Sequence, residues 1–91
     1  MYLEIVSPEA TLFANEVDSV TVPGVDGEFQ LLNNHAAIVS LLKAGNIKIH
    51  GNVTLTEDVA NKFITTGNTT SLAIQSGTLE MKDNKVIILA D

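Results

Sequence analysis

The amino-acid sequence predicts an all-β protein, an antiparallel sandwich or barrel of short strands. Apolar and polar residues alternate with a period of two along several segments, which is typical of strands with one buried and one solvent-facing side. Turn-forming residues separate these segments at intervals of about 8–12 residues, as they do in antiparallel sandwiches. The length of 91 residues corresponds to a single domain covering residues 1–91.

Four segments show this alternation most clearly, each with two apolar residues separated by one residue. The pairs are Leu3 and Ile5, Val20 and Val22, Ile47 and Ile49, and Leu79 and Met81. Turn-forming pairs lie between them, and they are Ser7-Pro8, Pro23-Gly24, Asp26-Gly27, Asn33-Asn34, Gly45-Asn46, Gly67-Asn68, Ser76-Gly77 and Asp83-Asn84. We expect a tight hairpin at Asp83-Asn84, because both residue types tolerate positive φ.

Two segments fit more than one local structure. The apolar residues of 38–42 are spaced for a short helix as well as for a strand. The Thr- and Asn-rich segment 51–71 includes a possible single helical turn at residues 57–62.

The last apolar run, residues 86–90, is apolar on both faces. A strand of this kind is either central and covered on both sides, or it lies under a partner. We favour a central strand covered within the chain, because that is the commoner case.

Composition excludes several classes of function. The chain carries a net charge of −6 and its five cations are all lysines, which disfavours nucleic acid and anionic membrane surfaces as partners. It has no cysteine, so disulfides and thiolate chemistry are absent. The longest apolar run is far below the ~20 residues that span a bilayer, and the N-terminus lacks the basic and apolar regions of a signal peptide. We expect no direct bilayer insertion.

No catalytic constellation is visible. The sequence has neither a phosphate-binding P-loop nor a dinucleotide-binding glycine motif. Its two histidines, His35 and His50, are not at a spacing that binds a metal on one helix, and nothing pairs either of them with a serine nucleophile. We therefore expect no enzyme activity, no metal and no cofactor.

Six motifs follow one another along the chain in a specific order. They are LEIVSPE at residues 3–9, GVDGEF at 24–29, HA at 35–36, GNIKI at 45–49, SGTLE at 76–80 and VIILAD at 86–91. In this order and spacing, the motifs resemble the epsilon subunit of F-type rotary ATP synthases, the counterpart of the mitochondrial delta subunit. The resemblance covers residues 2–50 and 72–91. It implies a flattened β-sandwich of about ten strands, and it favours a strand at residues 38–42.

The sequence departs from the family pattern at four places. Asn33 and Asn34 replace the usual Pro-Gly before the histidine, and Ala37 replaces a proline. The segment 51–71 is longer than is usual. The sequence ends at Asp91, where the family continues into a two-helix hairpin associated with inhibition of ATP hydrolysis and, in some members, with ATP binding. We expect neither property from these residues.

The resemblance implies a non-catalytic rotor subunit on the cytoplasmic side of the bacterial inner membrane. It would join the gamma subunit to the polar loops of the c-ring, so that torque from proton or sodium flow reaches the catalytic head. A stand-alone acidic β-sandwich that binds a peptide or protein is the alternative function.

Particular residues match the family's contact regions. Glu28 matches the acidic residue that faces the c-ring, and the residues that follow it are expected to complete a ring-facing loop. These residues are Phe29, Gln30, Leu31, Leu32, Asn33 and Asn34. Leu31 and Leu32 are equally good candidates for the core. His35 matches the histidine near the gamma contact, and surplus apolar residues of the sandwich are expected to face gamma too. The candidates are Phe13, Val39, Leu42, Ile87 and Leu89, with Ile87 and Leu89 preferred.

Overall fold

The structure, a computed structural model, describes all 91 residues and contains ten strands and one short 3-10 helix. The strands are β1 (Tyr2–Val6), β2 (Thr11–Glu16), β3 (Ser19–Gly24), β4 (Gly27–Leu32), β5 (Ile38–Leu42), β6 (Gly45–His50), β7 (Phe63–Thr66), β8 (Thr69–Ile74), β9 (Gly77–Lys82) and β10 (Lys85–Ala90). The 3-10 helix η1 spans Ala60–Lys62. The all-β prediction is confirmed.

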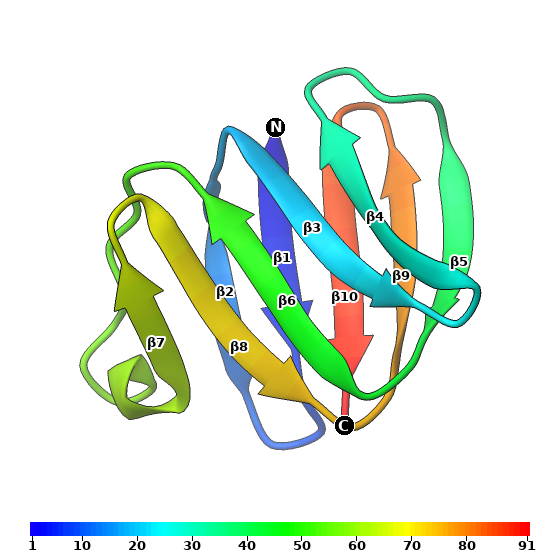
Figure 1. Ribbon diagram of the computed structural model, residues 1–91. Coiled ribbons are helices and arrows are strands. Elements are labelled where there is room, and N and C mark those ends of the chain that lie inside the picture. Colours follow the sequence, from blue (N-terminus) through cyan, green and yellow to red (C-terminus); the bar gives the residue numbers. More distant parts are fainter.

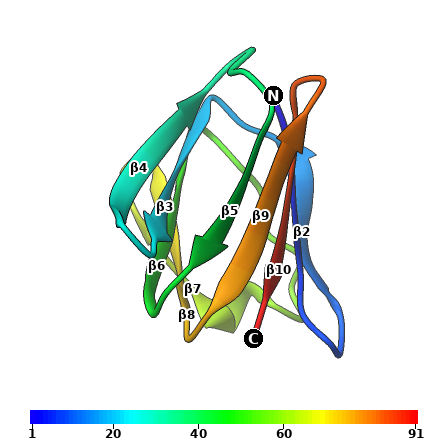
Figure 2. The same ribbon diagram turned by 90° about the vertical axis from the view of Figure 1, so that its right-hand side faces the viewer.

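The strands form a sheet that curls into two facing layers (Figures 1 and 2). The terminal layer follows the order β2-β1-β10-β9-β5, and the middle layer contains β4, β3, β6, β8 and β7. A single residue pair, Gly24 and Leu42, connects the two layers where β3 meets β5. Every pairing is antiparallel except that of β1 with β10, which is parallel. These two strands are the first and the last of the chain, so no hairpin fixes their relative direction.

The core lies between the layers and consists of the apolar residues that the alternation predicts. All eight residues of the four apolar pairs are buried, and most of them have no exposed surface. Burying a side chain of this size stabilises the fold by about 1.5–3 kcal/mol. A one-residue shift of any of these strands would turn its apolar residues to solvent, so the core also fixes the register.

Residues 38–42 form strand β5 and not a helix. β5 pairs with β9 along its whole length, from Ile38 opposite Met81 to Leu42 opposite Gly77. This pairing buries Leu42 and leaves Val39 and Leu41 exposed, so four apolar residues that fit one helical face are divided between two sides of a sheet.

The segment 51–71 covers the core beside β7. Its helical turn is η1, within the predicted residues 57–62, and it is followed by β7 and β8. Val59 is buried, and Val53 and Leu55 pack against the core. The rings of Phe13 in β2 and Phe63 in β7 lie 6.5 Å apart and join the two layers at this edge. The segment therefore has a structural role.

The last strand, β10, is central but is not covered on both faces. It lies between β1 and β9, and its Val86 and Ile88 are completely buried. Leu89 is 55% exposed, because no second layer of this chain lies outside the terminal layer. The preference for a strand covered within the chain was wrong. The predicted hairpin before β10 is confirmed, with φ of 53° at Asp83 and 60° at Asn84.

Candidate docking site

The outer faces of the two layers differ in polarity. On the middle layer, register places Ser19, His50 and Thr69 in one row, and a second row contains Thr21, Lys48 and Ser71. The exposed apolar residues Leu32 of β4 and Ile64 of β7 continue these rows at the two edge strands. The Nε2 atom of His50 lies 2.9 Å from the hydroxyl oxygen of Thr21, so the histidine is held within this polar surface. A hydroxyl-rich face of this kind is well suited to contact with water.

The outer face of the terminal layer carries three of the six large apolar residues that are exposed. Leu41 is 61% exposed, Val39 is 75% exposed and Leu89 is 55% exposed, and Ile87 is half-buried beside them. Val25 in the β3–β4 turn is 50% exposed, and its N–H donates a 3.1 Å hydrogen bond to the Leu41 carbonyl. These five residues are called the apolar patch below. A cluster of exposed apolar side chains of this kind marks interaction sites on soluble proteins.

A groove of about 600 Å³ opens at one end of the apolar patch. Its walls come from the ends of β1, β5 and β10, the start of β9 and the β3–β4 turn. Val6, Pro8, Val25, Leu41, Leu89 and Ala90 supply its apolar lining.

Two short-range contacts hold the rim of the groove in place. The hydroxyl of Ser76 donates a 2.5 Å hydrogen bond to the Asp91 carboxylate, and the Asp91 N–H donates a 3.1 Å bond to the Ser76 carbonyl. At Gly77 a Cβ atom would lie only 2.7 Å from the Leu89 carbonyl oxygen, so glycine permits the close approach of β9 and β10. The groove is therefore a fixed feature of the fold.

The predicted ring-facing loop is largely a strand. Residues 28–32 belong to β4, which forms a hairpin with β3 through a two-residue turn at Val25 and Asp26. The hairpin register sets Phe29 opposite Val22 and Leu31 opposite Val20, so both side chains point inward. Leu31 is completely buried, whereas Leu32 is 57% exposed. The assignment of residues 28–32 to a loop was wrong, because the alternation of inward- and outward-facing residues in β3 continues in β4, its hairpin partner.

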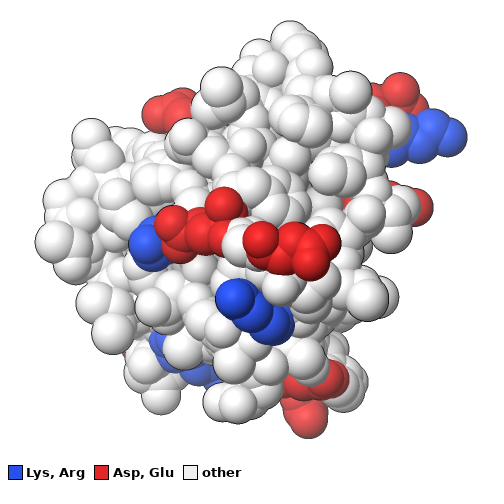
Figure 3. Space-filling model, turned by 45° about the vertical axis from the view of Figure 1, so that its right-hand side comes forward, with Lys and Arg blue, Asp and Glu red and all other residues white.

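Among the predicted ring-facing residues, Glu28 lies closest to the β3–β4 turn. Its carboxylate pairs with the Lys48 ammonium at 3.2 Å, and the Glu28 side chain is 54% exposed. Figure 3 brings the β4 and β5 side of the molecule forward and shows a short band of acidic side chains with lysines beside it. An exposed pair of this kind contributes only ~0–1 kcal/mol, so Glu28 remains available to an external cation.

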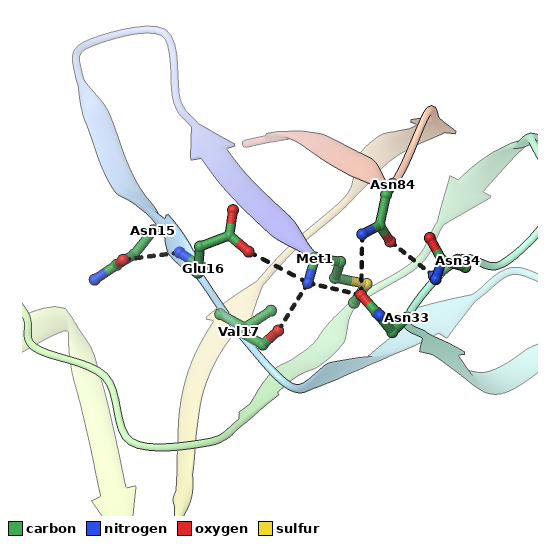
Figure 4. Close-up of polar contacts among 7 residues, drawn as sticks. All are labelled: Met1, Asn15, Glu16, Val17, Asn33, Asn34 and Asn84. Carbon is green, nitrogen blue, oxygen red and sulfur yellow. Dashed lines mark hydrogen bonds and ion pairs between the residues drawn. The ribbon is translucent and has the colours of Figure 1, made fainter.

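Asn33 and Asn34 lie at the other end of β4, where they join the two layers (Figure 4). The Asn33 side-chain oxygen accepts 3.0 Å hydrogen bonds from the Met1 ammonium and from the Asn84 amide. The Asn34 N–H donates a 2.7 Å bond to the Asn84 side-chain oxygen. The ammonium also donates to the Val17 carbonyl at 3.1 Å and pairs with Glu16 at 3.4 Å. These contacts give the two asparagines a structural role.

His35 is exposed and does not join Ile87 and Leu89 in one cluster. It follows Asn34, which contacts the β9–β10 turn, whereas Leu89 borders the groove at the far end of β10. Its N–H donates to the Leu32 carbonyl, and its Nδ1 atom lies 2.8 Å from the Ala36 carbonyl oxygen. Two further candidates, Phe13 and Leu42, are buried.

Sequence reasoning missed Val25 as a site residue and considered Leu41 only for its spacing. Val25 stands between two turn-forming pairs, Pro23-Gly24 and Asp26-Gly27, where an apolar residue has no strand to fill. An apolar residue inside a turn motif is a usable signal of an exposed contact. Leu41 gave no comparable signal, because either of two adjacent leucines can be the buried one.

The chemistry of the site is that of a docking surface. No group of three or more His, Cys, Asp or Glu side chains is arranged to hold a metal ion. None of the helical structure has the length and apolar character of a membrane-spanning helix. The fold and site thus define a class: a small β-sandwich with one hydroxyl-rich face and one apolar, grooved face.

Comparison with known proteins gives the family. The model of the family described as ATP synthase, Delta/Epsilon chain, beta-sandwich domain matches residues 1–91. The chain belongs to this family. It is 44% identical over 91 residues to an ATP synthase epsilon chain of Campylobacter curvus and 34% identical over 89 residues to one of Desulforamulus reducens. It spans 60% of the first relative's length and 57% of the second's.

Solved structures share the fold. A chain in the structure of the Tetrahymena thermophila mitochondrial ATP synthase central stalk and c-ring superposes with a TM-score of 0.75 at 16% identity. That match covers 98% of this chain and 61% of the other. A chain of the Euglena gracilis mitochondrial ATP synthase gives a TM-score of 0.73 at 20% identity, with 97% and 48% covered. The resemblance predicted from the motifs is confirmed.

Proposed function

We propose that this chain is a non-catalytic subunit of the central stalk of a proton- or sodium-translocating F-type ATP synthase. It links the gamma subunit to the polar loops of the c-ring and transmits torque during ATP synthesis. It is peripheral, on the cytoplasmic side of the bacterial inner membrane. Membership of the delta/epsilon family and relatives named ATP synthase epsilon chain support this function.

The gamma subunit docks on the outer face of the terminal layer. The observation that carries this assignment is the apolar patch, whose Val39, Leu41 and Leu89 are each more than half exposed although the chain has a complete core. Interfaces of permanent assemblies are more apolar than free surface, and each partner commonly buries about 800 Å². The patch and its groove provide the apolar centre of such an interface.

The c-ring contact lies at the β3–β4 turn. Glu28 is exposed there with its carboxylate already near one lysine, and a basic group of a ring loop can compete with Lys48 for it. Leu31 takes no part in this contact because it fills the core, and Asn33 and Asn34 lie away from it at the other end of β4, where they bridge the layers. A close-packed sandwich that carries both contacts is stiff and transmits force with little deformation.

A calorimetric titration of this chain against the gamma subunit of the same organism tests the proposal. We expect saturable one-to-one binding with a negative heat-capacity change, the signature of apolar burial. An absence of binding between two folded proteins would contradict the stalk function and would favour a stand-alone binding module.

A further inference from the structure

We propose that the partner surface covering the terminal layer carries three bands in a fixed order along β10: an anionic band, a cationic band and an apolar band. This inference rests on the proposed function and specifies the chemistry of the partner at the same site.

The order follows from the register of β1, β10, β9 and β5. The first row across the outer face contains Tyr2, Lys85 and Lys82. The second contains Glu4, Ile87, Glu80 and Val39, and the third contains Val6, Leu89, Thr78 and Leu41. The first row is therefore basic, the second is acidic with apolar residues beside the acids, and the third, at the groove, is mainly apolar.

Four charged residues of this face, Glu4, Glu80, Lys82 and Lys85, form no ion pair within the chain. The structure contains two ion pairs, Met1 with Glu16 and Lys48 with Glu28. Glu16 lies opposite Tyr2 at the β2 edge of this face, where the Met1 ammonium pairs with it. The Lys85 ammonium lies 5.5 Å above the Tyr2 ring, which holds it at the surface without neutralising it. Glu4, Glu80, Lys82 and Lys85 are thus free to pair with an external surface.

Glu80 determines the cationic band. In register it lies between Val39 of β5 and Ile87 of β10, at the centre of the apolar patch. A partner that buries Val39 and Ile87 must also cover the Glu80 carboxylate, and burying an unpaired charge is strongly unfavourable. The partner must therefore bring a lysine or arginine to Glu80.

The lysines determine the direction in which the partner lies. Rows on one face of a sheet are two residues apart, or about 6.8 Å along the strands. A partner turned end to end would keep its cationic band near Glu80 but would set its apolar band against Lys82 and Lys85 and its anionic band against Leu41 and Leu89. Charges buried without an opposite charge reject this arrangement, so the order of the rows selects one docking direction.

Charge reversal tests this inference. We expect Glu80→Lys and Lys82→Glu each to weaken binding to the gamma subunit at least ~10-fold at low salt. The matched controls Glu57→Lys and Lys62→Glu change the net charge equally on exposed residues beside η1, and they should stay within about twofold. The double variant with Glu80→Lys and Lys82→Glu restores the net charge but inverts the order of the bands, so it should bind as weakly as the single variants.

The outcomes separate this inference from the proposed function. If Leu89→Asp prevents binding while both reversals bind like the parent chain, gamma docks on this face and the three-band partner is wrong. If Leu89→Asp binds normally, both proposals fail. Circular dichroism checks that each variant is folded, and Glu80→Gln and Lys82→Gln replace any reversal that is not. Their expected loss is smaller but in the same direction, and unchanged affinity would overturn the inference.

Discussion

Leu41 and Leu89 lie on either side of Thr78 on the outer face of the terminal layer, each in register with it across one strand pair. They come from β5 and β10, strands that do not touch each other, and both are more than half exposed. On both sides of Thr78 the sheet therefore presents an apolar side chain that the core does not use. A binding partner explains this surface better than folding does.

Two adjacent leucines of β4 should differ sharply in their contribution to stability. Leu31 is completely buried and Leu32 is 57% exposed. We expect Leu31→Ala to lower the free energy of unfolding by about 2–5 kcal/mol, because it opens a cavity in the core. Leu32→Ala should change it by less than about 0.5 kcal/mol. Urea unfolding measures both values, and equal losses would contradict the hairpin register of β3 and β4.

Gly77 should not tolerate a side chain. In Gly77→Ala the new Cβ atom would lie 2.7 Å from the Leu89 carbonyl oxygen, so β9 and β10 would have to move apart. We expect a loss of about 1–3 kcal/mol in thermal or urea unfolding. The exposed neighbour Thr78 provides the control, since Thr78→Ala leaves the strand spacing unchanged. If Gly77→Ala leaves the free energy of unfolding unchanged, β9 and β10 are not as close as the structure has them.

The polar network at Met1 should stabilise the fold measurably. Asn33→Ala removes the oxygen that accepts hydrogen bonds from the Met1 ammonium and from Asn84. We expect a loss of about 1–3 kcal/mol, because the buried ammonium loses an acceptor. Asn61→Ala, at an exposed position of η1, should have little effect. If the two variants unfold at the same urea concentration, the network contributes nothing.

Glu28 should matter for assembly and not for folding. Its pair with Lys48 is exposed, so Glu28→Gln should change the free energy of unfolding by less than about 1 kcal/mol. The same change should reduce retention of the complex with gamma on the isolated c-ring, most clearly at low salt. Glu57→Gln, at an exposed acidic residue beside η1, is the control. Retention unaffected by Glu28→Gln would remove this residue from the ring contact.

Much of the fold was predictable because its signals are local. The alternation at Leu3 and Ile5 or at Ile47 and Ile49 requires only neighbouring residues, and it predicted the buried set correctly. The parallel pairing of β1 with β10 was not predictable in this way. It joins the two ends of the chain, and no local pattern specifies the direction of such a pair.

The candidate site was predictable only in part, since an apolar residue can face a core or a partner with the same sequence pattern. Ile87 and Leu89 were identified as surplus apolar residues, but Phe13 and Leu42 looked equivalent and are buried. The family's contact loop was assigned to residues 28–34 as one unit. A six-residue strand such as β4 extends roughly 17 Å, so Glu28 and Asn34 lie at opposite ends of the sandwich.

The most direct test of the docking face compares two aspartate substitutions in binding to the gamma subunit. Leu89→Asp places a charge in the apolar patch, and Ile64→Asp places one at a residue of β7 that is 72% exposed. The account predicts that Leu89→Asp weakens binding at least ~100-fold, whereas Ile64→Asp changes it by less than about threefold. Equal affinities, or a greater loss for Ile64→Asp, would contradict docking on the terminal layer.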